Sequence, residues 1–154
     1  MIIGVDMGAS AVKICALEGD RVAFTHYEHG RGGDMPALLE RLGLDAAGAE
    51  LIALTGLSAK NSGLERLGAP VKYIPEPEAI GEGACWLTGC DDLIVASIGT
   101  GTAFVHAKGG RYIHLCGTGV GGGTLKGLAV KGLGLSDLTE VGRLPARGGG
   151  GRVD

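Results

Sequence analysis

Aromatic rings, basic patches and paired cysteines are scarce in this sequence. Phe, Trp and Tyr make up 4% of the 154 residues, so few rings are available to stack on nucleic acid bases. The formal net charge is −3 and no basic patch stands out, so nucleic acid is not expected as a partner. The four cysteines contain no C-x-x-C pair, and a small buried thiol is the simplest interpretation for Cys15, Cys85 and Cys116.

A long hydrophobic run is also lacking. Asp6 interrupts the first apolar segment, which argues against a signal peptide. No apolar stretch reaches the roughly 18 residues that a membrane-spanning helix needs. We therefore expect a cytoplasmic protein without a membrane partner.

Glycine, in contrast, is abundant: the chain has 31 glycines, far above the usual share of roughly 7%. They follow no collagen-like period and gather in turns and loops. Because glycine lets backbone N–H groups come close to a ligand, this clustering favours a binding site lined by backbone. The chain is also 45% hydrophobic, which is enough for a core.

Apolar periodicity predicts a mixed α/β chain that opens with a three-stranded antiparallel meander. Helices and short apolar strands then alternate, as in a mixed sheet with flanking helices. The expected elements are strands 2–6, 11–17 and 21–27, a helix from Asp34 to about Leu42, strand 51–54, a helix over 58–67, strand 71–74 and a helix over 78–87.

The opening pattern then starts again. A strand is expected at 93–98, a hairpin of strands 102–107 and 111–116, and a helix at 122–133. The segment after residue 135 has little to bury and is expected to be a flexible tail. We therefore divide the chain into a complete first domain, an incomplete second domain and a tail, at residues 1–89, 90–135 and 136–154.

Two glycine turns of the phosphate-binding type each follow a hydrophobic strand. The first runs from Asp6 through Gly8 to Ser10, and the second covers 98–102. Their similar contexts suggest two related halves that face one nucleotide. A third run, 117–124, opens a helix, where three successive glycines give no capping advantage and favour close approach to a ligand.

Three charged residues are candidates for the chemistry of phosphoryl transfer. Asp6 suits a Mg²⁺ ion, directly or through water, although a turn-capping role is equally open. Lys13 interrupts an apolar strand and would suit a phosphate, unless it is a solvated edge residue. Glu76 lies between Pro75 and Pro77 at a strand end and is the candidate general base, whereas Glu78 fits a helix's first turn better.

In order and spacing these motifs resemble the type II pantothenate kinase (fumble-like) family of the actin/hexokinase/Hsp70 ATPase superfamily, in its N-terminal portion only. The resemblance covers residues 1 to about 140. It implies a ribonuclease H-like first domain with a mixed sheet, followed by the start of a second related domain. The segments that carry it are 4–13, 54–56, 76–79, 98–102 and 117–124.

This resemblance implies ATP and Mg²⁺ as cofactors and assigns the catalytic role to Glu76. In the pantothenate pocket, where bacterial members often carry an arginine, this chain has His114, with Arg111 three residues earlier; both are candidate substrate residues. The implied ATP-binding residues are Asp6, Gly8, Ser10, Lys13, Gly99, Thr100, Gly101, Thr102, Gly121, Gly122, Gly123 and Thr124.

The expected reaction is ATP-dependent phosphorylation of pantothenate to 4′-phosphopantothenate, in coenzyme A biosynthesis. Family chains continue well beyond residue 154 with an adenine-binding segment, so a complementary C-terminal half or a homodimer is the expected partner. Two alternatives remain open. One is a non-catalytic remnant or partner subunit of a split kinase. The other is a different ATPase of the superfamily, such as a sugar kinase or a dehydratase activator.

Overall fold

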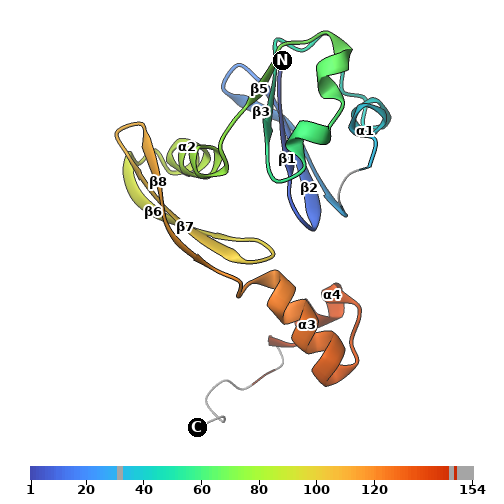
Figure 1. The fold of residues 1–154 in the computed structure, drawn as a ribbon, viewed down its shortest axis with the longest axis vertical. Helices are drawn as coiled ribbons and strands as arrows, with labels where there is room; N and C mark the ends of the chain where they lie inside the picture. Colours follow the sequence, from blue (N-terminus) through green and yellow to red (C-terminus); the bar gives the residue numbers. More distant parts are fainter. Residues whose placement is uncertain (31–32, 146–147, 149–154) are drawn as a thin grey trace.

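The computed structural model describes residues 1–30, 33–145 and 148. The N-terminal part of the chain forms a five-stranded mixed sheet, which we call the first sheet (Figure 1). Its strand order is β3-β2-β1-β4-β5. β1 is antiparallel to β2 and parallel to β4, and β4 is parallel to β5, so the carboxyl ends of β1, β4 and β5 share one edge. This confirms the predicted mixed α/β sheet. The strands are β1 Ile2–Met7, β2 Ala11–Glu18, β3 Arg21–His29, β4 Leu51–Thr55 and β5 Val71–Tyr73.

One face of the first sheet, the outer face, carries the core. Along β1, Ile3, Val5 and Met7 are buried, whereas the residues between them point to the opposite, inner face. Helix α1 (Met35–Arg41) packs Leu38 and Leu39 against this core. The helix begins as the sequence predicts, because the Asp34 carboxylate accepts the Ala37 N–H at 3.2 Å.

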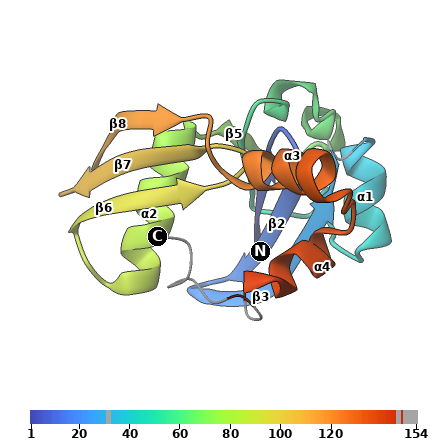
Figure 2. The ribbon, with the colours of Figure 1, turned by 90° about the horizontal axis from the view of Figure 1, so that it is seen from below.

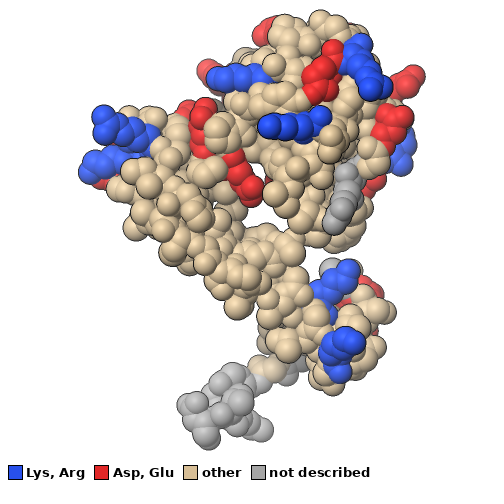
Figure 3. Space-filling model, in the orientation of Figure 1, with Lys and Arg blue, Asp and Glu red and all other residues tan. Residues whose placement is uncertain are grey.

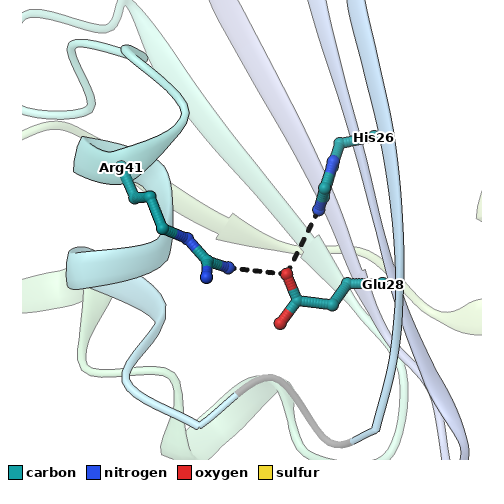
Figure 4. Close-up of polar contacts among 3 residues, drawn as sticks. All are labelled: His26, Glu28 and Arg41. Atoms are coloured by element: carbon teal, nitrogen blue, oxygen red, sulfur yellow. Dashed lines mark hydrogen bonds and ion pairs between the residues drawn. The ribbon is translucent and has the colours of Figure 1, made fainter.

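A small ionic cluster fastens α1 to β3 (Figure 4). Arg41 Nη2 on α1 lies 2.6 Å from Glu28 Oε2 on β3, and His26 Nε2 lies 3.3 Å from the same oxygen. The Arg41 side chain is 64% exposed, so such a pair contributes about 0–1 kcal/mol. The buried leucines therefore decide where α1 lies.

The helix predicted over 58–67 is wrong. Two short 3₁₀ helices, η1 (Ala59–Asn61) and η2 (Leu64–Leu67), stand there instead. Gly63 between them has φ +75°, a left-handed conformation that ends any continuous helix. Leu64 still enters the core, so the apolar signal was sound although the helix type was not.

Helix α2 (Glu76–Thr88) begins two residues earlier than predicted and ends at Gly89, which has φ +70°. Pro77 fits within the first turn, where its missing N–H is not needed. Although α2 follows the strands of the first sheet, it packs against the next three strands along the chain, β6, β7 and β8 (Figures 1 and 2).

These three strands form the second sheet, an antiparallel meander in the order β6-β7-β8. Gly109 and Gly110, with φ +53° and +71°, make the turn between β7 and β8, so the predicted hairpin is confirmed. Tyr112 packs on Gly81 of α2, and Val105 is fully buried on the same face. The strands are β6 Asp92–Ile98, β7 Thr102–Lys108 and β8 Arg111–Thr118.

Two helices complete the described chain. α3 (Gly122–Leu133) matches its prediction, and Figure 1 shows it standing away from the second sheet. α4 (Leu138–Arg143) lies in the segment for which the sequence predicted only a tail, and the Asp137 carboxylate caps it by accepting the Thr139 N–H at 2.8 Å. Most of the remaining tail, including 149–154, lies outside the described residues. Among described helices, none is long and apolar enough to cross a membrane.

Candidate functional site

The first glycine turn joins β1 to β2 and lies beside an ion pair. Asp6 and Lys13 are direct cross-strand neighbours on the inner face, and Lys13 Nζ lies 2.6 Å from Asp6 Oδ2. Lys13 therefore has Asp6 as an anionic partner, and its contact with a phosphate stays a prediction. Both side chains keep substantial exposure, 53% for Lys13 and 31% for Asp6, so they remain open to a ligand.

The end of β4 presses against the same carboxylate. Gly56 has φ +93°, and a Cβ there would lie 2.7 Å from Asp6 Oδ1 and 2.5 Å from the Met7 carbonyl oxygen. Only glycine fits this position. The neighbouring Thr55 hydroxyl oxygen is buried and has no hydrogen-bond partner within the described structure. Sequence reasoning gave neither residue a role, although the unusual Thr-Gly ending of an apolar strand was the available signal.

The two phosphate-type turns meet in space. Ser10 Oγ lies 2.6 Å from Thr100 Oγ1, although the two residues are 90 positions apart in the chain. The expectation that the turns of the two halves face each other therefore has direct geometric support. Either hydroxyl serves as the donor in this contact.

The third glycine run packs on the second turn, backbone against backbone. The Gly122 N–H donates to the Gly99 carbonyl at 2.9 Å, and the Gly123 N–H donates to the Thr100 carbonyl at 3.0 Å. A Cβ on Gly121 would lie 2.7 Å from the Gly101 carbonyl group. Packing on the second turn therefore accounts for part of this glycine run, and its contact with a ligand stays a prediction.

Two threonine hydroxyls hold this arrangement together. Thr102 Oγ1 donates to the Val120 carbonyl at 2.8 Å. Thr124 Oγ1 donates to the Gly119 carbonyl at 3.1 Å and accepts the Gly121 N–H at 3.3 Å. Both threonines shape the third run, and their contact with a nucleotide stays a prediction.

Glu76 lies at the carboxyl edge of the first sheet, as the sequence predicted. It is the first residue of α2, is exposed, and lines a cavity of about 230 Å³ together with Thr55, Lys60 and Tyr73. The carboxyl ends of β4 and β5 form its floor, where parallel strands commonly bind ligands. Lys60 is a cationic neighbour of the candidate base that sequence reasoning missed.

The two candidate substrate residues are placed differently. Arg111 pairs with Lys108 at the tip of the β7–β8 hairpin, the end of the second sheet opposite the glycine turn. Seven residues separate it from Thr118, about 23 Å along an extended strand. The structure therefore does not bring Arg111 to the turns. His114 lies nearer, since a Cβ on Gly117 would be 3.5 Å from its Nε2.

A second, larger cavity of about 560 Å³ opens on the inner face of the first sheet. Gly4, Cys15 and Ala53 lie in its lining, with the Asp6–Lys13 pair also contributing. Burial raises the pKa of the Cys15 thiol above its usual value. A thiol with a raised pKa carries less of the nucleophilic thiolate near neutral pH.

The donor set suits a Mg²⁺ ion that is shared with phosphate. In the described part of the chain, no three His, Cys, Asp or Glu side chains gather as a metal site. Mg²⁺ in phosphoryl-transfer enzymes needs only one or two carboxylates, because water and phosphate oxygens complete its shell. Asp6 beside the first turn provides such a carboxylate.

Known structures with similar folds define the class of protein. One similar structure is component A of the (R)-2-hydroxyglutaryl-CoA dehydratase of Acidaminococcus fermentans. The match covers 96% of this chain and 59% of the length of that protein, with a TM-score of 0.71 and 20% identity. Another is a ROK family glucokinase from Streptomyces griseus, solved with glucose and AMPPNP. The match covers 73% of this chain and 46% of the length of the glucokinase, with a TM-score of 0.55 and 18% identity. The chain has the fold of the actin-like ATPase superfamily.

Sequence similarity narrows the class. A type II pantothenate kinase from Oceanobacillus iheyensis is 31% identical over 132 residues, which is 82% of this chain. The chain is therefore a relative of the type II pantothenate kinases, as its motifs indicated. It spans about half, 47%, of that relative's length. No family model matches the chain.

Proposed function

We propose that this chain is the phosphate-binding and acceptor-binding part of an ATP-dependent pantothenate kinase. The observation that carries the proposal is the meeting of the two glycine turns, through Ser10 and Thr100, beside the Asp6–Lys13 pair. Hydroxyl groups from two halves and one cation thus surround a single small region. Phosphoryl transfer requires this kind of positioning and charge neutralisation more than covalent chemistry.

In this proposal each side chain has a defined task. Lys13 neutralises charge on the phosphates, and Ser10 and Thr100 exchange their mutual hydrogen bond for bonds to phosphate oxygens. Asp6 would hold Mg²⁺, which screens phosphate charge when bound. Glu76 accepts the proton of the substrate's primary hydroxyl as its oxygen attacks the γ-phosphorus and ADP leaves. The four free cysteines fit a reducing, cytoplasmic location.

The same proposal requires a complementary half. The chain spans 47% of its pantothenate kinase relative, so about half of that relative's length has no counterpart in it. We therefore expect kinase activity only when that half is supplied. A sugar-kinase activity has weaker support, because the glucokinase likeness rests on fold alone, at 18% identity.

The test is pantothenate-dependent ADP release, measured with and without a co-expressed C-terminal half. Glu76→Gln is expected to lower the rate of the complemented enzyme by roughly 10²–10⁴-fold, the usual size of a general-base effect. Glu78→Gln is the matched control and is expected to be mild. A crippled Glu78 variant beside an active Glu76 variant would show that the base is misassigned. Pantothenate-dependent turnover by the 154-residue chain alone would refute the need for a second half.

A further inference from the structure

The hydroxyl group of Thr55 is exceptional within the described part of the chain. It holds the single buried side-chain nitrogen or oxygen atom that has no hydrogen-bond partner there. Buried hydroxyl groups are nearly always paired, because an unpaired donor has given up its bonds to water for nothing. An unpaired hydroxyl beside a candidate active site therefore needs a physical reason.

Polar groups around the end of β4 are already engaged with one another. The Leu54 carbonyl accepts the Ile74 N–H at 2.7 Å, and the Asp6 carboxylate holds Lys13 at 2.6 Å through Oδ2. Neither bond involves the Thr55 side chain. The hydroxyl is thus left for a group that binds to the chain.

Thr55 lies where the two cavities of the first sheet meet. It lines the larger one, of about 560 Å³, together with Asp6, and the smaller one, of about 230 Å³, together with Glu76. In the parallel pairing of β1 with β4, Asp6 and Thr55 are direct partners, so they share the inner face with Cα atoms about 4.8 Å apart. Thr55 therefore connects the phosphate end of the site with the candidate base.

One side-chain rotation changes what this residue presents to the cavities. Thr55 as a whole is only half-buried, although its hydroxyl oxygen is fully buried. A step of about 120° about χ1 brings the hydroxyl to the position that the methyl group now holds. The hydroxyl can therefore turn toward a ligand without any movement of the backbone.

The surroundings favour a neutral partner over a phosphate. Asp6 faces Lys13 with Oδ2, but its Oδ1 faces the end of β4, where a Cβ on Gly56 would lie 2.7 Å away. A carboxylate oxygen on this side repels an anion and tolerates an alcohol. The alcohol that phosphoryl transfer requires here is the acceptor itself.

We propose that Thr55 binds the primary hydroxyl of the acceptor and aims its oxygen at the γ-phosphorus, an inference that rests on the proposed kinase function. Because Glu76 accepts the proton of that hydroxyl, Thr55 takes the donor role. Its O–H bonds to one lone pair of the acceptor oxygen, and the other lone pair forms the new O–P bond as the bond to ADP breaks. A fixed attacking oxygen is what productive orientation requires.

Two substitutions at one position test this role. Thr55→Val removes the hydroxyl and keeps the shape, whereas Thr55→Ser keeps the hydroxyl. With each chain co-expressed with a C-terminal half, calorimetry measures the binding of pantothenate and of an analogue that lacks the primary hydroxyl. The preference for pantothenate over the analogue should fall by about tenfold in Thr55→Val, as expected for one hydrogen bond, and persist in Thr55→Ser.

Kinetics and a matched control sharpen the test. Thr55→Val should lower kcat/KM for pantothenate by about tenfold or more and leave the KM for ATP unchanged, because the lost bond goes to the acceptor. Thr25→Val is the control. Thr25 is exposed, lies on β3 and lines the larger cavity but not the one with Glu76, so this variant should keep both values.

Thermal unfolding of the 154-residue chain alone separates this role from a structural one. An unpaired hydroxyl destabilises the folded chain, so Thr55→Val should keep the melting temperature or raise it by roughly 2–4 °C. A hydroxyl that holds the fold together would instead make the melting temperature fall.

Two results would overturn the inference and leave the kinase function standing, provided that the wild-type complex binds and phosphorylates pantothenate. One is a Thr55→Val enzyme that keeps the full preference for pantothenate over the analogue. The other is a Thr55→Val chain that melts at a lower temperature. A wild-type complex that neither binds nor phosphorylates pantothenate would overturn the proposed function, and the inference with it.

Discussion

The two sheets open with equivalent hairpins but differ in what covers them. Seventeen of the twenty buried apolar residues of the described chain lie before residue 70, and only Val105, Ala107 and Ala129 lie after it. Ile3 of β1 is 0% exposed, whereas its repeat counterpart Ile94 of β6 is 65% exposed. The comparison teaches that the same strand pattern yields a core only where helices of the same chain cover it.

The surface of the second sheet agrees with this difference. In Figure 3 the face over β6–β8 and its junction with α3 shows no charged side chains, except at the far end of the sheet. Ile98 is 73% exposed, and Leu125 and Leu128 of α3 are 63% and 65% exposed. Exposed apolar surfaces of this kind are typical of interaction sites.

The largest expected effect comes from the matched isoleucines. Ile3→Ala should lower the free energy of unfolding by about 2–5 kcal/mol, because it leaves a cavity in a packed core. Ile94→Ala should change it by about 0.5 kcal/mol or less, because the side chain is already in water. Urea unfolding followed by circular dichroism measures both. Equal losses would mean that the face of the second sheet that carries Ile94 is also covered.

A second test concerns the covered face of the second sheet. A Cβ on Gly81 would overlap the ring of Tyr112, so Gly81→Ala should destabilise the packing of α2 by about 1–3 kcal/mol. Adding Tyr112→Leu makes room and should restore part of the loss. Additive losses in the double variant, measured by thermal unfolding, would show that α2 does not rest on this residue.

The third prediction concerns association of the isolated chain. Its uncovered apolar surfaces should make it self-associate, while residues 1–75 should remain compact, because they hold the first sheet and its core and exclude α2, which packs on the second sheet. Ile98→Lys should weaken association by about tenfold, equivalent to about 1.4 kcal/mol. Sedimentation velocity measures each species. A monodisperse, cooperatively unfolding monomer of the full chain would show that the second half closes its own core.

The smallest expected effect lies at the tip of the second sheet. Asp92 accepts a hydrogen bond from Lys108 at 2.6 Å and contacts His106 at 2.9 Å. Its pKa is lowered, first by the Lys108 hydrogen bond and next by the one with His106, while the pKa of Lys108 is raised by Asp92. The Asp92–Lys108 ion pair is therefore lost when the pH falls through the pKa of Asp92, which lies below its usual 3.8. It is also lost when the pH rises through the pKa of Lys108, which lies above its usual 10.5.

An NMR titration of the Asp92 carboxyl carbon checks this small effect. Lys108→Met should raise the Asp92 pKa toward its usual value, with little change in global stability because the pair is exposed. An Asp92 titration that is identical in the variant would show that the pair does not persist in solution.

Much of the fold was predictable because period and turn chemistry are local. The alternation in β1, the Asp34 cap and the Gly109–Gly110 turn each specify their element within a few residues. Gly63 converted the predicted helix into two 3₁₀ turns, since a left-handed residue interrupts the ladder. The short helix α4 was missed because too little apolar period marks it.

The candidate site was only partly predictable. The pairing of Asp6 with Lys13 follows from a hairpin register, which a sequence of alternating residues can suggest. The meeting of Ser10 with Thr100, and the packing of Gly121 on Gly101, depend on how two halves approach each other. No local pattern contains that information, and the distance of Arg111 from the turns follows from the same arrangement.

The central claim is that the glycine turns of both halves hold the phosphates of one ATP. ³¹P NMR of Mg-AMPPNP, titrated with the 154-residue chain, tests it directly, because both turns belong to this chain. The β- and γ-phosphate signals should shift on binding. Ser10→Ala and Thr100→Val should each weaken that binding by about tenfold or more, as expected for hydrogen bonds to a charged group. Shifts that survive both substitutions, or that depend on one turn only, would contradict the account.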